Sequence, residues 1–293
     1  MKIVTLYGLA IILLFHCQAI HDTHDRSSEK SIHRGYNAGQ DSVYNPDGTT
    51  VLTRFKPLQS YRRTIAETGS FGSFLRHLPL KPHGTDVLLY DGSVKPGEGV
   101  HCAVVRMDIG DKDLQQCADA IIRLRAEYLF ESNQFAKISF HFTNGERVDY
   151  VRYAEGFRVI DIDNNMQWVK KAPRDYSHQT FLNYLELVFT YAGSYSLSRE
   201  LIPVRNREDL EIGDIFIQGG FPGHAVIVVD MIIKETTGDK QFLLAQSYMP
   251  AQEIHILMNP KGNSPWYPVA SSGKLVTPEW IFDYDDLKRF NDE

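Results

Sequence analysis

The chain has 293 residues and a net charge of −6, and 43% of its residues are hydrophobic and 23% charged. This is ordinary globular composition, so the chain can bury a sizeable core. Its lysines and arginines are scattered and form no basic stripe, which argues against nucleic-acid binding.

The first residues have the pattern of a secretory signal peptide. A short positive start precedes an apolar run at residues 3–15, and small residues favour cleavage after Ala19. The apolar run is too short for a comfortable membrane span. We therefore expect removal of residues 1–19, no transmembrane span in the mature protein, and a periplasmic or extracellular location. A lipid anchor at Cys17 is the less favoured alternative, because the residues before it are bulky.

A polar segment separates the signal peptide from the part of the chain that looks folded. Residues 20–49 lack sustained periodicity and predict a linker, and residues 50–293 predict a single α+β domain. The first elements expected in that domain are a short helix at residues 70–78 and a hairpin. Its two strands are expected at 87–90 and 100–109, around a glycine-containing turn.

The strongest helix signal covers residues 114–130. Apolar side chains recur there at helical spacing, and Asp113, with Gln116 three residues later, has the pattern of a capping box. This assignment places Cys117 in the first turn of the helix. Unpaired backbone N–H groups and the helix dipole favour a thiolate at such a position.

The remaining sequence predicts mostly β-structure with one more long helix. Asn144-Gly145 is a strong hairpin signal. The elements expected after the first long helix are strands at 136–143, 148–152, 157–162 and 166–169, a helix at 180–192, strands at 214–218, 225–233, 241–246 and 254–258, and a short helix at 278–290.

The stretch GDIFIQGGFPGHAVIVVD, residues 213–230, predicts two strands joined by a glycine-rich turn, and His224 opens the second strand. Glycines allow a backbone to approach a partner element closely. Alternation places His224, Val226, Val228 and Asp230 on one face of the strand. A polar ring at the mouth of an apolar strand costs free energy unless it is hydrogen-bonded or used in chemistry.

A helix-borne thiol and a strand-borne imidazole are the parts of a nucleophile–base pair. Cys117 is the candidate nucleophile, and His224 is the candidate base. Gln246 ends the next predicted strand and is the candidate for orienting the imidazole, with His255 as an alternative. The candidate donors for an oxyanion hole are Gln115, Gln116 and the backbone N–H of Cys117.

Two other interpretations of Cys117 stay open. In an oxidising compartment it would pair with Cys102 in a disulfide, because these two cysteines remain after cleavage. Alternatively, it is an inert thiol on the apolar face of its helix. The sequence contains no CxxC or HExxH motif and no paired histidines at ligand spacing, so we expect no metal or other cofactor.

The Gln-Cys pair at a helix start, followed far downstream by Gly-Asp and by the Gly-His that opens a strand, resembles the CHAP and NlpC-type papain-like cysteine amidohydrolases and peptidases. The resemblance implies an α+β papain-like fold with the nucleophile helix packed on an antiparallel sheet and an insertion at residues 131–205 between them. It implies Cys117 as nucleophile, His224 as base and Gln246 as the third residue. The implied substrates are cell-wall peptides or related amides.

The segments QCADAIIRLRAEYL and FIQGGFPGHAVIVVD also resemble an uncharacterised secreted bacterial family that is catalogued only as a domain of unknown function. That resemblance implies no activity. Two hypotheses therefore remain. One is a secreted thiol amidohydrolase or peptidase, and the other is a non-catalytic envelope binding protein on the same fold.

Overall fold

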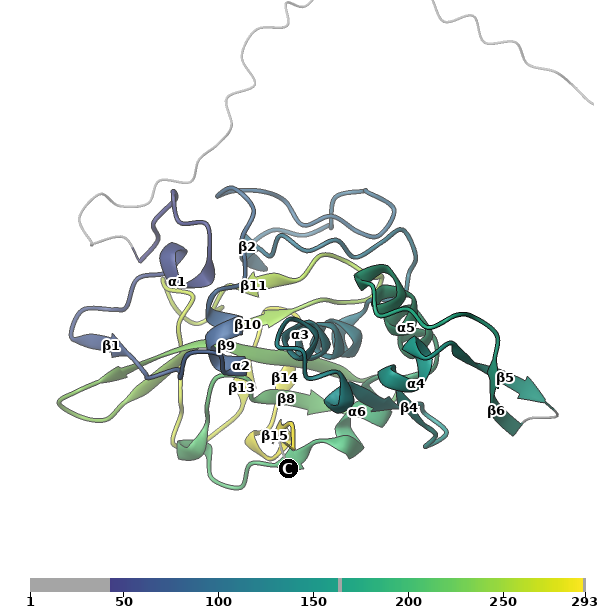
Figure 1. Ribbon diagram of the computed structural model, residues 1–293. Helices are drawn as coiled ribbons and strands as arrows, with labels where there is room; N and C mark the ends of the chain where they lie inside the picture. Colours follow the sequence, from purple (N-terminus) through teal and green to yellow (C-terminus); the bar gives the residue numbers. More distant parts are fainter. Residues whose placement is uncertain (1–42, 163–164, 292–293) are drawn as a thin grey trace, which may run out of the picture. The chain divides into compact units, whose positions relative to one another are not determined.

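A mixed α+β fold with a large antiparallel sheet is formed by residues 43–162 and 165–291, which the computed structural model describes (Figure 1). The signal peptide and residues 20–42 of the linker, as inferred from sequence, lie outside the described residues. The helices are α1 (Val51–Arg54), α2 (Phe71–Arg76), α3 (Cys117–Glu131), α4 (Tyr150–Ala154), α5 (His178–Tyr191) and α6 (Ser194–Glu200), with 3₁₀ turns η1 (Phe135–Lys137), η2 (Arg207–Asp209) and η3 (Tyr284–Asp286). The strands are β1 (Tyr61–Arg63), β2 (His101–Val104), β3 (Ser139–His141), β4 (Arg147–Asp149), β5 (Phe157–Ile162), β6 (Asn165–Lys170), β7 (Ile202–Pro203), β8 (Ile215–Gln218), β9 (His224–Lys234), β10 (Lys240–Gln246), β11 (His255–Leu257), β12 (Tyr267–Pro268), β13 (Leu275–Val276), β14 (Ile281–Phe282) and β15 (Leu287–Arg289).

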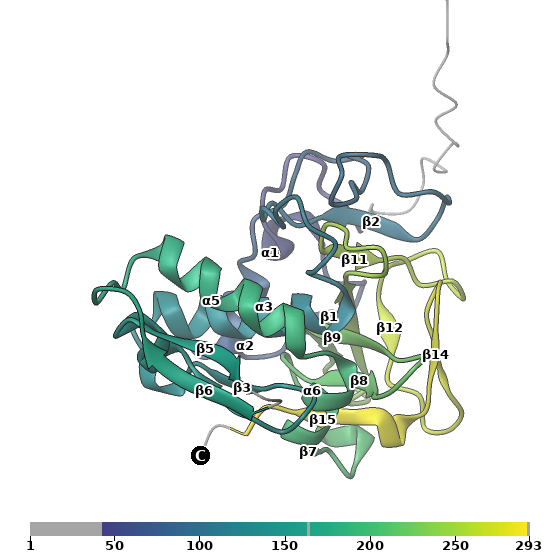
Figure 2. The same ribbon diagram turned by 90° about the vertical axis from the view of Figure 1, so that its right-hand side faces the viewer.

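The main sheet has nine strands and separates two hydrophobic layers. Its order is β2-β11-β10-β9-β8-β15-β7, with β1 also paired to β9 and β12 to β10. Helices α3 and α5 lie on one side of it, and β14 from the C-terminal tail lies on the other (Figure 2). Strands β8, β9, β10 and β11 pair in chain order, and each is antiparallel to the next. The strands that carry His224, Gln246 and His255 are therefore neighbours in the sheet.

Strand β9 is buried on both faces, and its side chains alternate between the two layers. Ala225, Ile227 and Val229 belong to the helix-side cluster, which also contains most of the buried side chains of α3. Val226 and Val228 belong to the tail-side cluster, which also contains Phe216, Phe242, Phe282 and Leu287. A register shift opposite Leu243 and Leu244 interrupts this alternation. Beyond it the faces are exchanged, so Met231 belongs to the tail-side cluster and Ile232 to the helix-side cluster.

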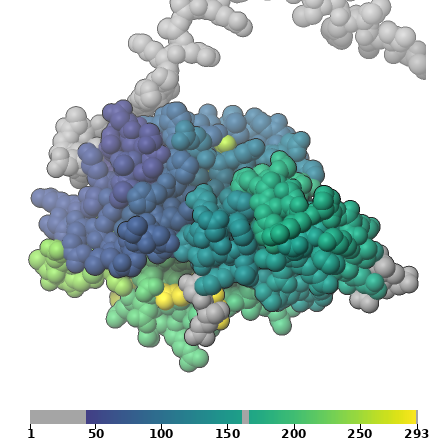
Figure 3. Space-filling view, in the orientation of Figure 1, coloured from purple at the N-terminus to yellow at the C-terminus, as the bar shows by residue number. Residues whose placement is uncertain are grey.

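Helix α3 packs against β9 and β10. The start of α3 lies next to the loop that follows β10. The elements between α3 and β8 in the chain are the β3–β4 hairpin, α4, the β5–β6 hairpin, α5 and α6. In the space-filling view the blue and teal segments hide most of the sheet from this side (Figure 3). None of the described helices combines the length and the apolar character needed to cross a membrane.

Most elements with strong local signals form where the sequence places them. The long helix begins at Cys117 instead of residue 114, and the second long helix covers His178–Tyr191. The Asn144-Gly145 hairpin is formed by β3 and β4, with Gly145 at a φ of 90°, a left-handed conformation that glycine adopts without steric cost. Strands β8, β9, β10 and β11 confirm the four strands expected between residues 214 and 258.

Three expected elements are wrong. The strand expected at residues 148–152 ends at Asp149, and the helix α4 begins at Tyr150. Residues 87–90 form only isolated bridges, and β2 pairs with β11 instead of closing the expected hairpin. Residues 278–290 do not form a helix but contain β14, η3 and β15. In this tail Leu287 pairs with Phe216 of β8 and is fully buried, so burial against the sheet overrides the weak local helical pattern.

Candidate functional site

Cys117 is the first residue of α3, and the loop that follows β10 holds this helix start in place. The Ser247 hydroxyl lies between two backbone carbonyls, at 2.7 Å from that of Gln252 and 3.1 Å from that of Gln115, and the backbone N–H of Ala251 donates to the Asp113 carboxylate at 2.6 Å. The contacts with Gln115 and Asp113 join segments more than 130 residues apart in the chain. These contacts therefore hold the loop after β10 against the start of α3.

The cap of α3 differs from the expected capping box. Gln116 is the N-cap residue, and its backbone N–H donates to Asp119 at 3.2 Å. Asp113 instead accepts hydrogen bonds from the Gln116 side chain, at 3.0 Å, and from the loop after β10. The helix therefore begins later than the sequence pattern predicts, with Cys117 at its first position.

His224 opens β9 after a tight glycine turn. A Cβ atom on Gly223 would lie 2.3 Å from the Ser194 hydroxyl, and one on Gly219 would lie 2.2 Å from the Ser198 hydroxyl. Both serines belong to α6, so the close approach that these glycines permit is to α6. This helix was not among the elements expected from sequence.

The structure brings His224 and Gln246 together. The His224 Nε2 and Gln246 Oε1 atoms are 2.9 Å apart, and each residue is only 1% exposed. The Gln246 amide nitrogen donates to Glu279 at 2.6 Å and lies 3.3 Å from Nε2 of His255. Glu279 in turn forms an ion pair with Lys95 at 2.6 Å.

Three aromatic rings surround the His224 imidazole. Its centroid lies 4.7 Å from that of Tyr248, 5.3 Å from that of Trp280 and 5.9 Å from that of Phe282. Burial among these groups lowers the pKa of His224 to about 4, although the hydrogen bond with Gln246 and the charge of Glu279 act in the opposite direction. The imidazole is therefore neutral at neutral pH.

His255 is buried on the far side of Gln246 and is also neutral. Its Nδ1 lies 2.9 Å from the backbone carbonyl of Glu253, which can only accept a hydrogen bond. Burial lowers the pKa of His255 to about 3. The hydrogen-bond partner of His255 is thus Gln246, and the partner of His224 is also Gln246. His255 therefore does not take the place of Gln246 beside the His224 ring, which was the alternative expected from sequence.

The Cys117 thiol lies beside the backbone N–H of Ala225, the residue after His224, but burial governs its protonation. Burial, followed by the charge of Asp119, raises the pKa of Cys117 to about 11, and the backbone N–H groups of Ala225 and Ala118 offset only part of this increase. The expected thiolate at the helix start is therefore not the resting form. In the described part of the chain, no hydrogen bond joins this thiol to the His224 imidazole.

Both cysteines that the disulfide interpretation would join are free thiols. Cys102 lies on β2, where its sulfur is 3.5 Å from the backbone carbonyl of Ile256 and 3.7 Å from that of Leu257. Burial raises the pKa of Cys102 to about 12. Cys102 is thus a partly buried thiol in the outer part of the sheet.

The two glutamines before Cys117 have different roles. The Gln116 side chain is used in its hydrogen bond with Asp113. The Gln115 side chain is buried, its oxygen accepts from Arg123 at 3.3 Å, and its nitrogen has no hydrogen-bond partner among the described residues. Gln115 therefore retains an unused N–H donor two residues before the thiol.

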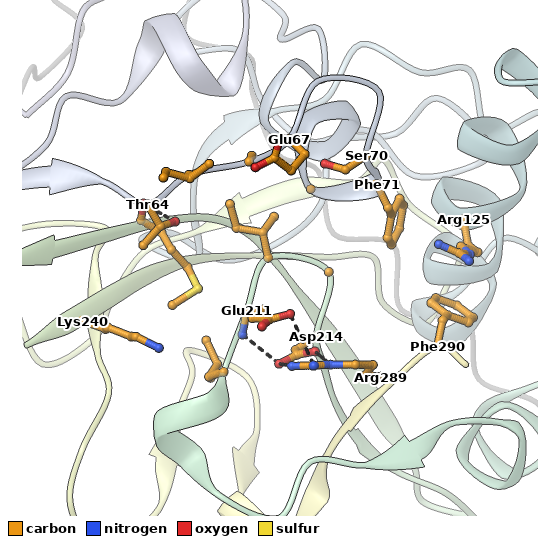
Figure 4. Close-up of a pocket in the computed structure, with 17 residues that line it drawn as sticks. Thr64, Glu67, Ser70, Phe71, Arg125, Glu211, Asp214, Lys240, Arg289 and Phe290 are labelled. Atoms are coloured by element: carbon orange, nitrogen blue, oxygen red, sulfur yellow. Dashed lines mark hydrogen bonds and ion pairs between the residues drawn. The ribbon is translucent and has the colours of Figure 1, made fainter. Parts of the chain in front are cut away.

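The Gly213-Asp214 pair has a structural role. Asp214 is buried and accepts two hydrogen bonds from Arg289 of β15, at 2.7 and 2.9 Å. These residues line a cavity of about 380 Å³ beside α2 and the C-terminal strand, where Arg289 also pairs with Glu211 at 3.3 Å (Figure 4). The charges of Asp214 and Arg289 are satisfied by each other, so this cavity is a poor candidate for the reactive centre.

Four residues around the site, Lys95, Glu279, Tyr248 and Trp280, were not predicted from sequence. Lys95 falls in an expected turn and Glu279 in the helix that did not form. They are 184 residues apart and meet only in the folded chain. No local pattern could have identified them. Among the described residues, no group of three or more histidine, cysteine, aspartate or glutamate side chains is arranged to hold a metal ion.

The pKa of Cys117 predicts slow alkylation at neutral pH. In a Cys17→Ser, Cys102→Ser variant, the rate of labelling by iodoacetamide should rise about tenfold for each pH unit between pH 7 and pH 10, since the thiolate is the reactive form. Intact-protein mass spectrometry at a series of times measures this rate. A plateau below pH 8 would contradict a neutral resting thiol, and the same variant unfolded in guanidinium chloride provides the ordinary cysteine profile.

Asp119 makes the stability of the fold depend on pH. Burial raises the pKa of this carboxyl to about 8 from 3.8, and one of its oxygens has no partner among the described residues. The folded state thus favours the protonated form of Asp119. The contribution of this group to the free energy of unfolding is therefore greatest below pH 4 and falls as the pH rises from 4 towards 8. In Asp119→Asn, which is neutral at every pH, the free energy of unfolding relative to wild type should rise over this range by up to about 1.4 kcal/mol per pH unit. Urea unfolding at several pH values tests this expectation, and Asp111→Asn, at an exposed site, is the control.

The chain matches one protein family, described as a domain of unknown function (4846), over residues 51–289. The match covers most of the chain, so the protein belongs to this family. No curated protein and no solved structure gives a match. Nothing in these comparisons links the chain to the CHAP or NlpC-type enzymes.

Proposed function

We propose that this member of the family of domain of unknown function 4846 is an exported thiol amidohydrolase or peptidase with a papain-like arrangement. Cys117 is the nucleophile, His224 the base and Gln246 the residue that orients the imidazole. The observation that carries the proposal is the buried His224–Gln246 hydrogen bond of 2.9 Å, beside a helix whose first residue is a cysteine. In this interpretation α3 is the nucleophile helix on the antiparallel sheet, and residues 131–205 are an insertion.

The reaction follows from these positions. The Cys117 thiol gives its proton to His224 as its sulfur attacks the carbonyl carbon of an amide, forming a C–S bond and an oxyanion. His224 returns the proton to the departing amine as the C–N bond breaks. Water then hydrolyses the thioester and releases the carboxylic acid. The backbone N–H of Cys117 and the unused amide nitrogen of Gln115 are the candidate donors to the oxyanion.

The neutral resting pair fits this scheme only if the charges form together with the attack. The pKa values of about 11 for Cys117 and about 4 for His224 oppose proton transfer before substrate binds. The carboxylate of Glu279 favours the imidazolium, and the backbone N–H of Ala225 favours the thiolate. Catalytic hydrogen bonds are often absent or long in unliganded enzymes and shorten in the substrate complex. The scheme therefore requires the thiol and the imidazole to approach each other when substrate binds.

The substrate class comes from the resemblance to the CHAP and NlpC-type enzymes. A peptide of the bacterial cell wall, or a related amide, is the proposed substrate, and export to the periplasm or the cell exterior would bring the protein to it. Neither a metal ion nor another cofactor has a part in this scheme.

A second candidate function is a non-catalytic envelope binding protein on the same fold. The observation that favours it is the protonation state of the site, because burial raises the pKa of Cys117 and lowers that of His224. In such a protein the site binds a ligand but does not activate its thiol.

The experiment is to incubate the protein with soluble muropeptides and with a set of fluorogenic peptide amides. The enzyme hypothesis predicts released amine and an acyl adduct on Cys117 in rapidly quenched samples, detected by peptide mass spectrometry. Cys117→Ser should abolish turnover, and Cys102→Ser, which replaces the other free thiol, should leave it unchanged. Muropeptide binding by calorimetry without turnover or adduct would overturn the enzyme hypothesis and support the binding protein.

A further inference from the structure

The Gln246 side chain has a defined orientation because every one of its polar atoms has a partner. A primary amide presents one accepting oxygen and a nitrogen with two donating N–H groups. The nitrogen lies 2.6 Å from Glu279 Oε2 and 3.3 Å from His255 Nε2, and the oxygen lies 2.9 Å from His224 Nε2. An amide side chain can be placed in two orientations that exchange its oxygen and nitrogen, and the surrounding groups decide between them.

The ion pair between Lys95 and Glu279 determines the orientation of the Gln246 amide. Glu279 Oε1 binds the Lys95 ammonium at 2.6 Å, and the two side chains are only 9% (Lys95) and 20% (Glu279) exposed. Glu279 therefore meets Gln246 as the carboxylate of an ion pair, which can only accept hydrogen bonds. The reversed amide would place its oxygen 2.6 Å from Glu279 Oε2, and neither of these two oxygens carries a hydrogen to donate to the other.

His255 supports the same orientation. Its Nδ1 faces the carbonyl of Glu253, so Nδ1 carries the hydrogen and Nε2 carries the lone pair. That lone pair accepts the second N–H of Gln246. Two acceptors therefore hold the amide nitrogen, and the amide oxygen is left to face His224.

This orientation determines the tautomer of His224. An amide oxygen only accepts, so His224 Nε2 must carry the hydrogen of the bond between them. A neutral imidazole has one hydrogen, and the lone pair is then on Nδ1. Nδ1 is therefore the atom that can take a proton.

We propose that Lys95 and Glu279 are positioning residues, which hold His224 in the Nε2–H tautomer through the amide of Gln246. The role in catalysis rests on the proposed function, where Nδ1 takes the proton of Cys117. Neither residue needs to touch the substrate. The hydrogen-bond chain runs from Lys95 through Glu279 and Gln246 to His224, and it joins the loop before β2, the C-terminal tail and two central strands.

The test measures the tautomer directly. Two-bond ¹H–¹⁵N correlation spectra of protein labelled in its histidine rings distinguish the Nε2–H and Nδ1–H forms, with His224 assigned by its loss in His224→Ala. Wild type should show the Nε2–H form. A Lys95→Met, Glu279→Met double variant removes the ion pair without stranding either charge, and should lose about half or more of that form. Glu279→Gln keeps an oxygen that can accept from Gln246 and should retain it.

The matched control is Lys112→Met, Glu186→Met, which removes an exposed ion pair, and should leave the His224 spectrum unchanged. The double variant should also lower kcat about tenfold or more at an unchanged KM, because the wrong tautomer has no lone pair on the reacting atom. A wild-type Nδ1–H form, or an unchanged spectrum in the folded double variant, would overturn the positioning role. If the spectra change as expected but wild type hydrolyses no amide, the positioning role holds and the proposed function fails.

Discussion

Replacement of His224 with alanine is expected to lower kcat for amide hydrolysis by about 100- to 10,000-fold, the usual contribution of a general base. His224 is the proposed acceptor of the thiol proton and later its donor to the leaving amine. The variant removes both transfers but keeps Cys117 and the start of α3. Steady-state rates on the fluorogenic peptide amides measure the effect.

His178→Ala is the control for this variant. His178 lies on α5, is half exposed and contacts Glu127 at 3.1 Å, so its loss should leave hydrolysis unchanged. Circular dichroism must show that His224→Ala is folded, because the change leaves the buried Gln246 oxygen without its partner. Near-wild-type activity in folded His224→Ala would refute its role as the base.

Replacement of Asp230 with alanine is expected to lower the free energy of unfolding by about 3–5 kcal/mol, the usual cost of removing one partner from a buried ion pair. The Asp230 side chain is completely buried in β9 and binds Nε of Arg63 at 2.8 Å and Nε of Arg76 at 2.7 Å. The variant leaves two largely buried guanidinium groups facing each other without a counter-charge. Urea unfolding followed by fluorescence measures the change.

Glu235→Gln is the matched comparison, because its ion pair with Arg62 is exposed. Those side chains are 54% (Arg62) and 66% (Glu235) exposed, so their pair should contribute less than about 1 kcal/mol. Equal effects of the Asp230 and Glu235 variants would show that the buried cluster does not hold β1 and α2 against β9.

Asp230 also shows how a tertiary irregularity changes a pattern read from sequence. Strict alternation places it on the face of His224, with Val226 and Val228. The register shift between β9 and β10 interrupts that alternation, and Asp230 reaches Arg76 of α2, a helix that packs on the helix side of the sheet. Sequence periodicity cannot locate such a shift, because it depends on how β10 pairs with β9.

Some features of the candidate site are local in sequence, and others depend on tertiary packing. Cys117, His224 and Gln246 could be chosen from sequence, since a helix start and two strand ends are local features. The chemistry of the thiol could not be predicted, because the helix dipole is local whereas the burial that outweighs it comes from the packing of α3 on the sheet. Glu279 was out of reach as well, because its segment was expected to be helical and its ion-pair partner is 184 residues away.

The sequence by itself determined the two long helices, the β3–β4 hairpin and the run of strands from β8 to β11, because each has a strong periodic pattern or turn signal of its own. Only the tertiary structure decided the pairing of β2 with β11, the strands of the tail and the protonation of Cys117 and His224. These features depend on free energies of burial and on contacts between residues far apart in the chain. A local sequence pattern contains neither.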